Sequence, residues 1–464
     1  MNSNIKLRGY QEEMIQALRE TIRSGKQYIL LQSPTGSGKT RILAHMVALA
    51  ALRGKRPMFT VPAREILIQT TRSLQAQNIT FGIIAAGFTS EPEQLIQVAT
   101  IQTLARRINS IQPPDFVVID ECHHAPASQW RKLWDVWPDT VFIGLTATPW
   151  RLDGKGLGDQ FETMVMGPTV RELIDQGYLS DYVVYAPPVG IDTSGIKTRA
   201  GDFAKDQLAD AVDKPTITGN AVAHYKKIAN GKRAVVAAVS IEHSKHITAE
   251  FNAAGVYAVH LDGCEDQNRR DHIMNDFAAG RIQVLSQVGI INEGVDIPGI
   301  EAVISLRPTK SLSLWLQFIG RALRPAPGKD RAIILDHAGN THLHGLPCDE
   351  REWSLEGAAK RSSGKKNTPN IQVKQCPGCY ACHAPADRCP SCGHIYHKQE
   401  REVDQVEGEL QAVDPKVMRL QRQQEVKQAQ TLEDLQELGR QRGYKPGWAY
   451  HIWKARLHRQ GVAA

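Results

Sequence analysis

A glycine-rich stretch at residues 33–40, Ser-Pro-Thr-Gly-Ser-Gly-Lys-Thr, constrains the fold of this chain more than any other feature. The apolar run at 28–31 before it predicts a buried strand, and the apolar-periodic run at 42–52 after it predicts a helix. Together they predict a phosphate-binding loop, because glycines let backbone N–H groups converge on a phosphate at the positive end of a helix. The alternative is a chance turn of Gly, Ser and Thr, which the strand and helix on either side disfavour.

This pattern assigns chemistry to individual side chains of the loop. Lys39 is expected to reach the β- and γ-phosphates of a nucleotide, and the Thr40 hydroxyl is expected to hold Mg²⁺. The residues expected around the nucleotide here are Thr35, Gly36, Ser37, Gly38, Lys39 and Thr40. The pattern's first glycine is Ser33 in this chain, a position that makes the turn rather than the chemistry.

A second nucleotide contact is expected upstream, where Arg8 and Gln11 open an amphipathic helix. A Gln side chain can pair bidentately with the N6 and N7 edge of adenine. Gln11 is therefore a candidate adenine reader, and Arg8 is placed with it at the nucleotide. The alternative for Gln11 is a solvated helix residue.

Two adjacent carboxylates, Asp120 and Glu121, follow the fully apolar strand expected at 116–119. Carboxylates at the end of a buried strand are costly unless a cation is near, and the Mg²⁺ expected at Thr40 would supply one. Asp120 would position the metal, and Glu121 would orient the attacking water and accept its proton. A solvated turn is the weaker alternative after four apolar residues.

Polar residues also follow the strands expected at 58–62 and 98–103. Doubly wound sheets bind ligands at the carboxyl ends of their strands. Arg64, Thr100 and Gln102 are therefore candidates for contacts with a nucleic-acid backbone.

A second alternating series of strands and helices begins after a stretch of weak periodicity, from about 187 to 214. Strands are expected at 234–239, 256–261 and 282–285, which predicts a second α/β domain of the same kind. Arg321 and Arg324 lie three apart near its end and so share one helix face. Guanidinium groups suit the charge that develops on a transferring phosphoryl group, and the alternative is a solvated basic face.

Five of the eight cysteines crowd between 376 and 392, and the two Cys-x-x-Cys pairs predict one tetrahedral zinc site. The expected ligands are Cys376, Cys379, Cys389 and Cys392, with Cys382, His383, His394 and His397 as spare candidates. A redox dithiol pair is the alternative. A closed site of four thiolates has a structural rather than a catalytic role.

The last part of the chain is expected to be helical and basic. From 415 to 464 there are ten Lys and Arg against four Asp and Glu, which is +6 of the chain's net +7. Aromatic residues alternate with Lys and Arg at 444–456 and could stack on bases. The compatible alternative is that these aromatics form the core of a small helical unit.

Bulk properties set the remaining expectations. The 464 residues favour about three domains, and the net charge of +7 is a mild indication of an anionic partner. The polar N-terminus lacks an apolar signal region, and no apolar run is long enough to span a bilayer. A cytoplasmic protein without membrane association is therefore expected.

Taken together, the motifs resemble those of a superfamily 2 helicase of the DExH type. In chain order they are Arg8-Gly9-Tyr10-Gln11, the Gly-Lys-Thr loop, Pro62-Ala63-Arg64-Glu65, Asp120-Glu121-Cys122-His123, Thr146-Ala147-Thr148, Gly294-Val295-Asp296 and residues 317–324. The amino-acid sequence at 306–311 and 333–340 is similar to that of bacterial RadD-like helicases and related phage helicases. The resemblance covers about residues 7–340.

The resemblance implies two RecA-like domains with ATP between them and nucleic acid crossing both. It implies that Gln11 reads adenine, that Glu121 is the catalytic base and that Arg321 and Arg324 act from across the cleft. It also places Gly294, Asp296 and Gln317 at the nucleotide. Asn292 and Gln317 depart from the Thr and His that many relatives carry, at positions that couple ATP to nucleic acid.

The expected fold class is α/β, with two RecA-like phosphate-loop domains containing parallel sheets, a small zinc ribbon and a helical C-terminal tail. The expected ranges are 1–186 and 216–345 for the two domains, with a linker at 187–215 between them, a second linker at 346–372, the ribbon at 373–398 and the tail at 399–464.

The expected function is an ATP-dependent DNA helicase or translocase that uses ATP, Mg²⁺ and Zn²⁺. The alternatives are an RNA helicase or remodeller and a nucleic-acid-binding adaptor with vestigial motor activity. Expected partners are nucleic acid and a replication or repair protein at the ribbon or tail.

Overall fold

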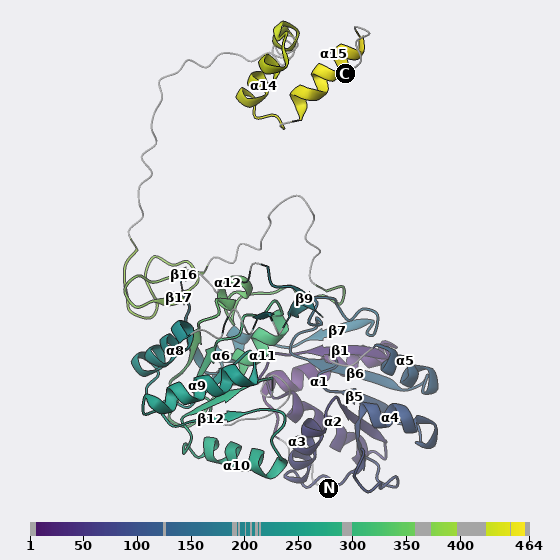
Figure 1. The fold of residues 1–464 in the computed structure, drawn as a ribbon. Coiled ribbons are helices and arrows are strands. Elements are labelled where there is room, and N and C mark those ends of the chain that lie inside the picture. The colour runs from purple at the N-terminus through teal and green to yellow at the C-terminus, as the bar shows by residue number, and fades with distance from the viewer. Residues whose placement is uncertain are drawn as a thin grey trace. The chain divides into compact units, whose positions relative to one another are not determined.

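The computed structural model forms two compact units, residues 1–397 and 398–464, which are described separately (Figure 1). The residues that it describes are 6–123, 127–187, 193, 195–199, 201–204, 207–208, 212, 215–289, 299–357, 373–396, 424–445 and 447–459. No helix within these ranges is both long enough and apolar enough to cross a membrane.

The first lobe of the large unit is built on a seven-stranded sheet whose order is β3-β4-β2-β5-β6-β1-β7, with every pair parallel. Its strands are β1 (Tyr28–Gln32), β2 (Pro57–Val61), β3 (Gly82–Ile84), β4 (Gln97–Thr100), β5 (Phe116–Ile119), β6 (Val141–Thr146) and β7 (Thr163–Met166). The central strands are almost wholly buried, which explains why they read as continuous apolar runs.

The helices of the first lobe return the chain between these parallel strands. They are α1 (Gly9–Arg23), α2 (Lys39–Leu52), α3 (Arg64–Gln75), α4 (Ile101–Arg107), the 3₁₀ turn η1 (Ile108–Ser110), α5 (Ala127–Val136) and α6 (Val170–Asp175). Helix α2 begins directly at the end of the glycine-rich loop and α3 directly after β2, so the polar residues at the carboxyl ends of the strands share one edge of the sheet.

The second lobe has an eight-stranded sheet in the order β12-β13-β11-β14-β15-β8-β17-β16. Its strands are β8 (Asp181–Tyr185), β11 (Ala234–Ala237), β12 (Ala258–Leu261), β13 (Val284–Gln287), β14 (Ala302–Ser305), β15 (Arg331–Asp336), β16 (Lys374–Gln375) and β17 (Ala381–His383). Its helices are α8 (Pro215–Ile228), α9 (Ile241–Ala253), α10 (Gln267–Ala278), α11 (Leu312–Ala322) and α12 (Asn340–His344). The expected α/β class with two such domains is confirmed.

The junction of the two lobes differs from the expected boundary at 186. Strand β8 lies before that boundary, yet it pairs in parallel with β15 and therefore belongs to the second sheet. A small antiparallel hairpin, β9 (Thr198–Arg199) with β10 (Asp202–Phe203), lies in the stretch expected to be a linker. The hairpin is fixed to the second lobe because Asp202 accepts a hydrogen bond from Arg307, with 2.9 Å between the two atoms.

The segment expected to be a second linker from 346 instead returns to the first lobe at 353–357. The Trp150 indole N–H donates to the Ser354 carbonyl at 3.1 Å, and the Gly158 N–H donates to the Leu355 carbonyl at 2.8 Å. Leu355 packs against the apolar core of the first lobe. Gly156 permits this approach, because a Cβ there would lie only 1.9 Å from the Leu355 carbonyl oxygen.

The small unit contains the helices α14 (Leu432–Gln441) and α15 (Trp448–Arg459), and residues 424–428 are helical as well. Thr431 and Asp434 form a reciprocal capping box at the start of α14. Trp448, Ile452 and Trp453 pack against a buried cluster that contains Leu435, whereas Tyr450 is 52% exposed. Part of the aromatic run therefore forms a core, and Tyr450 remains accessible on the surface.

Candidate functional site

The glycine-rich loop connects the carboxyl end of β1 to the start of α2. Gly36 and Gly38 adopt positive φ angles of +87° and +80°, which a residue with a Cβ adopts only under strain. The Ser33 hydroxyl donates to the Ser37 hydroxyl at 2.7 Å, and the Ser33 N–H donates to the Thr146 carbonyl at 3.0 Å. Ser33, which replaces the first glycine of the pattern, therefore holds the base of the loop.

Lys39 begins α2 and directs its ammonium group back toward the loop. Its Nζ donates to the carbonyls of Ser33 at 3.0 Å and Pro34 at 3.2 Å. Burial lowers the pKa of Lys39, and the nearby carboxylates of Glu121 and Asp120 oppose that shift. The ammonium group is thus held between the loop and the carboxylates, where a bound phosphate could replace the carbonyl partners.

The start of α1 packs against the loop through two side chains that converge on one carbonyl. The Tyr10 hydroxyl donates to the Ser37 carbonyl at 2.5 Å, and the Gln11 side-chain amide donates to it at 3.0 Å. Gln11 is fully buried, which excludes the solvated helix residue that the sequence left open. Arg8 donates to the Tyr10 hydroxyl at 3.0 Å and lies over the Tyr178 ring.

Tyr10 is a member of this site that the sequence reasoning missed. Its position directly before Gln11 could have indicated this role. Two adjacent residues at the start of a helix can both reach a loop that packs there. Adenine reading by Gln11 stays a prediction.

Asp120 and Glu121 lie directly after β5, as the sequence predicts. Asp120 Oδ1 accepts from the Glu121 N–H at 3.0 Å, and Glu121 has a positive φ of +46°, rare for a residue with a side chain. Burial and the neighbouring Glu121 raise the pKa of Asp120 to about 7, against the opposing effect of Lys39. An added cation would reverse this shift, because it favours the charged carboxylate.

These carboxylates fit a hydrated divalent cation. Glu121 Oε2 is buried and accepts no hydrogen bond from the described residues, although it lies 3.5 Å from His123 Nδ1. Thr40 and Asp120 line the same cavity, so a hydroxyl and a carboxylate, both oxygen donors that Mg²⁺ prefers, face one space.

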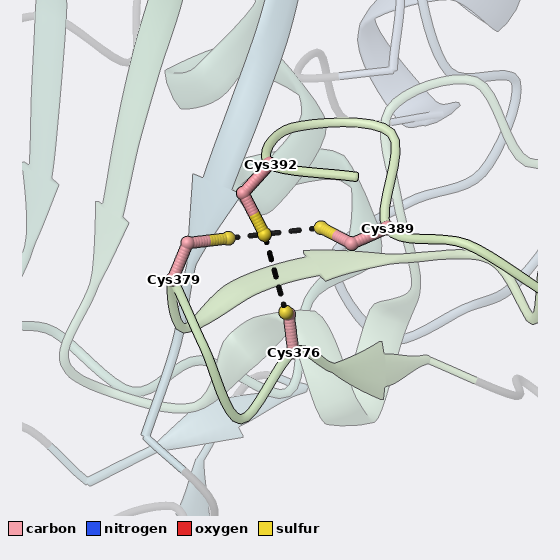
Figure 2. Close-up of side chains that lie close together, drawn as sticks. All are labelled: Cys376, Cys379, Cys389 and Cys392. Carbon is pink, nitrogen blue, oxygen red and sulfur yellow. Dashed lines mark hydrogen bonds between the residues drawn. The ribbon is translucent and has the colours of Figure 1, made fainter. Parts of the chain in front are cut away.

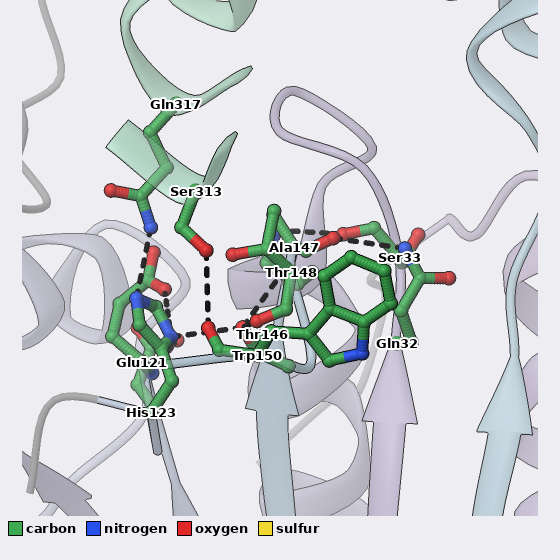
Figure 3. Close-up of polar contacts among 12 residues, drawn as sticks. Gln32, Ser33, Glu121, His123, Thr146, Ala147, Thr148, Trp150, Ser313 and Gln317 are labelled. Atoms are coloured by element: carbon green, nitrogen blue, oxygen red, sulfur yellow. Dashed lines mark hydrogen bonds and ion pairs between the residues drawn. The ribbon is translucent and has the colours of Figure 1, made fainter. Parts of the chain in front are cut away.

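His123 connects the two lobes through a chain of hydrogen bonds (Figure 3). With the Gln317 amide nitrogen as donor, His123 Nε2 accepts at 3.1 Å. The ring proton then lies on Nδ1, which faces the Thr146 hydroxyl at 2.9 Å. That hydroxyl in turn donates to the Thr148 carbonyl at 2.8 Å. Gln317 of the second lobe therefore contacts the first lobe at His123, two residues after Glu121.

Helix α11 brings Arg321 to the glycine-rich loop, and the turn after it brings Arg324 there. The helix ends at Ala322, so the two arginines do not share a helix face as the sequence predicted. Both line a cavity of about 900 Å³ together with Lys39, Asp120 and Glu121. Arg321 is 4% exposed, and burial lowers the pKa of both arginines. The structure therefore brings together all five residues that the sequence singled out for catalysis.

Close packing holds α11 against the loop. A Cβ built on Gly320 would lie 2.7 Å from the Cβ of Thr35, and one built on Gly36 would lie 3.6 Å from Cγ of Arg324. The cavity is thus closed on one side by the second lobe.

The three candidate nucleic-acid residues lie at the ends of β2 and β4, which are neighbours in the sheet. Arg64 is exposed and lies over the Phe88 ring, and exposed Gln102 donates to the Pro62 carbonyl at 2.9 Å. Thr100 is buried, with its hydroxyl donating to Thr103 at 2.9 Å. Gly294 and Asp296, expected at the nucleotide, lie outside the described residues.

Four cysteines converge at the far edge of the second sheet (Figure 2). Cys376 and Cys392 have their sulfurs 3.7 Å apart, those of Cys379 and Cys389 are 3.6 Å apart, and all four lie within 4.8 Å of one another. The edge of a tetrahedron around Zn²⁺ with bonds of about 2.3 Å is about 3.8 Å, so the arrangement fits this metal.

Two of the spare ligands suggested by the sequence, Cys382 and His383, have other partners, and His397 lies outside the described residues. The Cys382 thiol faces the Ala186 carbonyl at 3.9 Å, and His383 bonds to the Ala384 carbonyl and the Tyr396 hydroxyl. Strand β17 follows the first Cys-x-x-Cys pair and pairs antiparallel with β8, so the ribbon continues the second sheet.

Comparison with known proteins gives two matching families. Residues 4–151 match the family described as the res subunit of type III restriction enzymes, and residues 216–326 match the helicase conserved C-terminal domain. The first match lies in the first lobe and the second in the second lobe.

A protein of Lactococcus phage (isolate 7-9), described only as a 51.5 kDa protein, is 36% identical over 84% of this chain and 83% of its own length. A Saccharomyces cerevisiae protein named as an ATP-dependent helicase, IRC3, is 28% identical over 72% of this chain and 51% of its own length. The chain thus spans about half of the yeast relative.

A solved structure of the ATP-dependent Type ISP restriction-modification enzyme LlaBIII bound to DNA is similar to this chain with a TM-score of 0.53. The sequences are 19% identical, and the match covers 71% of this chain and 27% of that one. At this identity the similarity concerns the fold.

We predict that Gly320→Ala impairs ATP turnover without a matching loss of stability. Alanine favours a helix interior over glycine by about 1 kcal/mol, but its Cβ would press on Thr35 and push α11 from the loop. A displacement of this kind is expected to cost on the order of 10- to 100-fold in turnover. Steady-state hydrolysis and thermal unfolding measure the two effects.

Gly263→Ala is the matched control, because a Cβ at that position meets no atom within 4 Å. Full turnover by Gly320→Ala would contradict the inferred contact between α11 and the loop.

Proposed function

The chain belongs to the superfamily 2 helicases, an ATP-hydrolysing family, and from this membership we propose that it is a motor that moves along DNA. The observation that carries the proposal is a cavity lined by Lys39 and Glu121 of the first lobe and by Arg321 and Arg324 of the second. A cavity built from both lobes lets hydrolysis change how the lobes meet, and alternating closure would move the protein along a strand.

Each side chain at the cavity has a proposed task in hydrolysis. Glu121 orients the attacking water and accepts its proton, which its buried oxygen without a hydrogen-bond donor among the described residues supports. Lys39, Arg321 and Arg324 stabilise the charge that develops on the transferred phosphoryl group. Thr40 and Asp120 would hold Mg²⁺, which supplies further charge neutralisation at the phosphates.

The choice of DNA as the track rests on two supports. The similar restriction-modification enzyme is described as bound to DNA. Exposed Arg64 and Gln102 lie at the carboxyl edge of the first sheet, where they can contact phosphates or sugars of a strand. An RNA track is the second candidate, because backbone contacts of this kind carry no preference between the two polymers.

The four-cysteine ribbon is proposed to hold one structural zinc ion. The sulfur separations of 3.6 and 3.7 Å support four thiolate ligands around one metal and leave no open position for catalysis. Because β17 of the ribbon pairs with β8, the metal would stabilise the edge of the second lobe. A protein partner at the ribbon or tail stays a prediction.

We expect one polynucleotide to stimulate ATP hydrolysis strongly in the wild type, with single-stranded or duplex DNA above RNA. Lys39→Ala should abolish turnover under every condition, because it removes the ammonium group from the phosphate site. The assay measures steady-state hydrolysis with no polynucleotide, single-stranded DNA, duplex DNA and RNA. Stimulation by RNA alone would replace the DNA assignment, and no stimulation would favour the adaptor.

Glu121→Gln is expected to retain ATP binding and lose turnover by at least about 100-fold, since it removes the general base but keeps the shape of the side chain. Binding of a fluorescent ATP analogue and hydrolysis measure the two properties separately. Normal turnover in this variant would remove Glu121 from its proposed role.

The purified chain is expected to contain about one zinc per molecule by elemental analysis. Cys389→Ser should lower that content and destabilise the second lobe, because the ribbon would lose its hold on β8. Cys264→Ser is the control, since Cys264 is exposed and outside the cluster. A folded, metal-free wild type would refute the zinc site.

A further inference from the structure

Lys329 occupies a position in the second lobe that none of the helicase motifs explains. The chain leaves α11 through Pro325-Ala-Pro-Gly328, and the Lys329 N–H closes this turn on the Ala326 carbonyl at 3.2 Å. Proline cannot continue a helix, and Gly328 supplies a positive φ of +73°. The turn thereby brings the Lys329 side chain back beneath the end of α11.

The Lys329 ammonium group donates to three backbone carbonyls at once. One belongs to Ala322, the last residue of α11, and one to Arg324 just after it, the latter at 2.8 Å. The third belongs to Ile300, just before β14, at 2.9 Å. An ammonium group has three N–H donors, so all of them are used.

These contacts fix the end of α11 and the turn after it, which carry the arginines. The last carbonyls of a helix have no partners within the helix and carry partial negative charge, which a lysine can neutralise. The intervening carbonyl, of Leu323, accepts from the Ser180 N–H at 2.7 Å. The three carbonyls from 322 to 324 are thus all bonded, two of them to Lys329.

We propose that Lys329 is a positioning residue for ATP hydrolysis, which holds the end of α11 so that Arg324 and Arg321 face the phosphate cavity. The inference rests on the proposed function of these arginines. Lys329 is absent from the cavity wall, and it acts through the backbone of the residue whose side chain lines that wall.

The surroundings of Lys329 limit the pH range over which its ammonium group stays protonated and bonds to the three carbonyls. Burial lowers the pKa of Lys329 to about 8, Glu301 opposes the shift and Arg233 adds to it. The ammonium form is therefore present below about pH 8 and is lost as the pH rises through that value. The neutral amine has two N–H donors and can serve at most two of the three carbonyls.

The test compares Lys329→Met with wild type in the full-length chain. The expected result is a fall in kcat on the order of 10- to 100-fold, with little change in the affinity for a fluorescent ATP analogue. The affinity is preserved because the glycine-rich loop is intact. Thermal unfolding and zinc content verify that the variant is folded.

Lys226→Met is the matched control. Lys226 also donates to a carbonyl at the end of a helix in the second lobe, that of Ala254 after α9, at 3.0 Å. It has no contact with α11 among those described, so its loss is expected to leave kcat within twofold of wild type. Equal losses in the two variants would mean a general effect of helix capping and would overturn the proposal.

A double-mutant cycle separates positioning from stability. If Lys329 acts through Arg324 as well as Arg321, then Lys329→Met should lower kcat by a smaller factor in the Arg324→Ala background than in the wild type. If the loss of kcat in the double variant equals the product of the losses in the two single variants, the proposal is overturned. Lys329→Arg should recover part of kcat, because guanidinium keeps several N–H donors.

The pH profile gives a readout that a purely structural lysine would not change. The ratio of wild-type kcat to that of Lys329→Met should be largest below pH 8 and decline above it, and a constant ratio would contradict the charged contact. Wild type without ATP turnover would refute the proposed function, whereas an active wild type matched by Lys329→Met would refute only the role of Lys329.

Discussion

The structure depends on the placement of opposite charges around one partly dehydrated cavity. Asp120 and Glu121 come from the first lobe together with Lys39, and the buried guanidinium of Arg321 comes from the second. Charges taken out of water are costly unless paired, so each lobe supplies part of what stabilises the other's charges. The cavity therefore has its full set of charges only when the lobes meet.

Helix α11 meets the first lobe along a single stripe of its surface. The Ser313 hydroxyl donates to the Trp150 carbonyl at 3.0 Å, Gln317 contacts His123, and Gly320 packs on Thr35. These positions are spaced by four and three residues, so all three share one face of α11. Arg324 follows two residues after the helix ends at Ala322. A rotation of α11 would thus disturb the carboxylate side and the phosphate side of the cavity together.

The sequence predicted the local parts of this site because each is a short, contiguous pattern. The loop at 33–40, the carboxylates after β5 and the four cysteines require only strand and helix periodicity and the chemistry of a few side chains. The junctions between lobes were not predictable in this way. Strand β8 joins the second sheet by pairing with β15, about 150 residues later, and no periodicity encodes that choice of partner. The packing of Leu355 on the first lobe was not predicted for the same reason, because it is a contact between residues far apart in the sequence.

The pairing of β8 also explains why the ribbon is part of the second lobe rather than a separate domain. One side of β8 pairs with β15, and without the ribbon its other side would present unpaired N–H and C=O groups at the edge of the sheet. Strand β17 covers that edge, and the Gln375 amide adds a hydrogen bond to the Ala186 carbonyl at 2.6 Å. Two short strands cannot form a stable sheet alone, so their order depends on the four cysteines and on β8 together. Because β8 follows directly from Ser180, which bonds to the end of α11, the ribbon supports the same junction that carries the arginines.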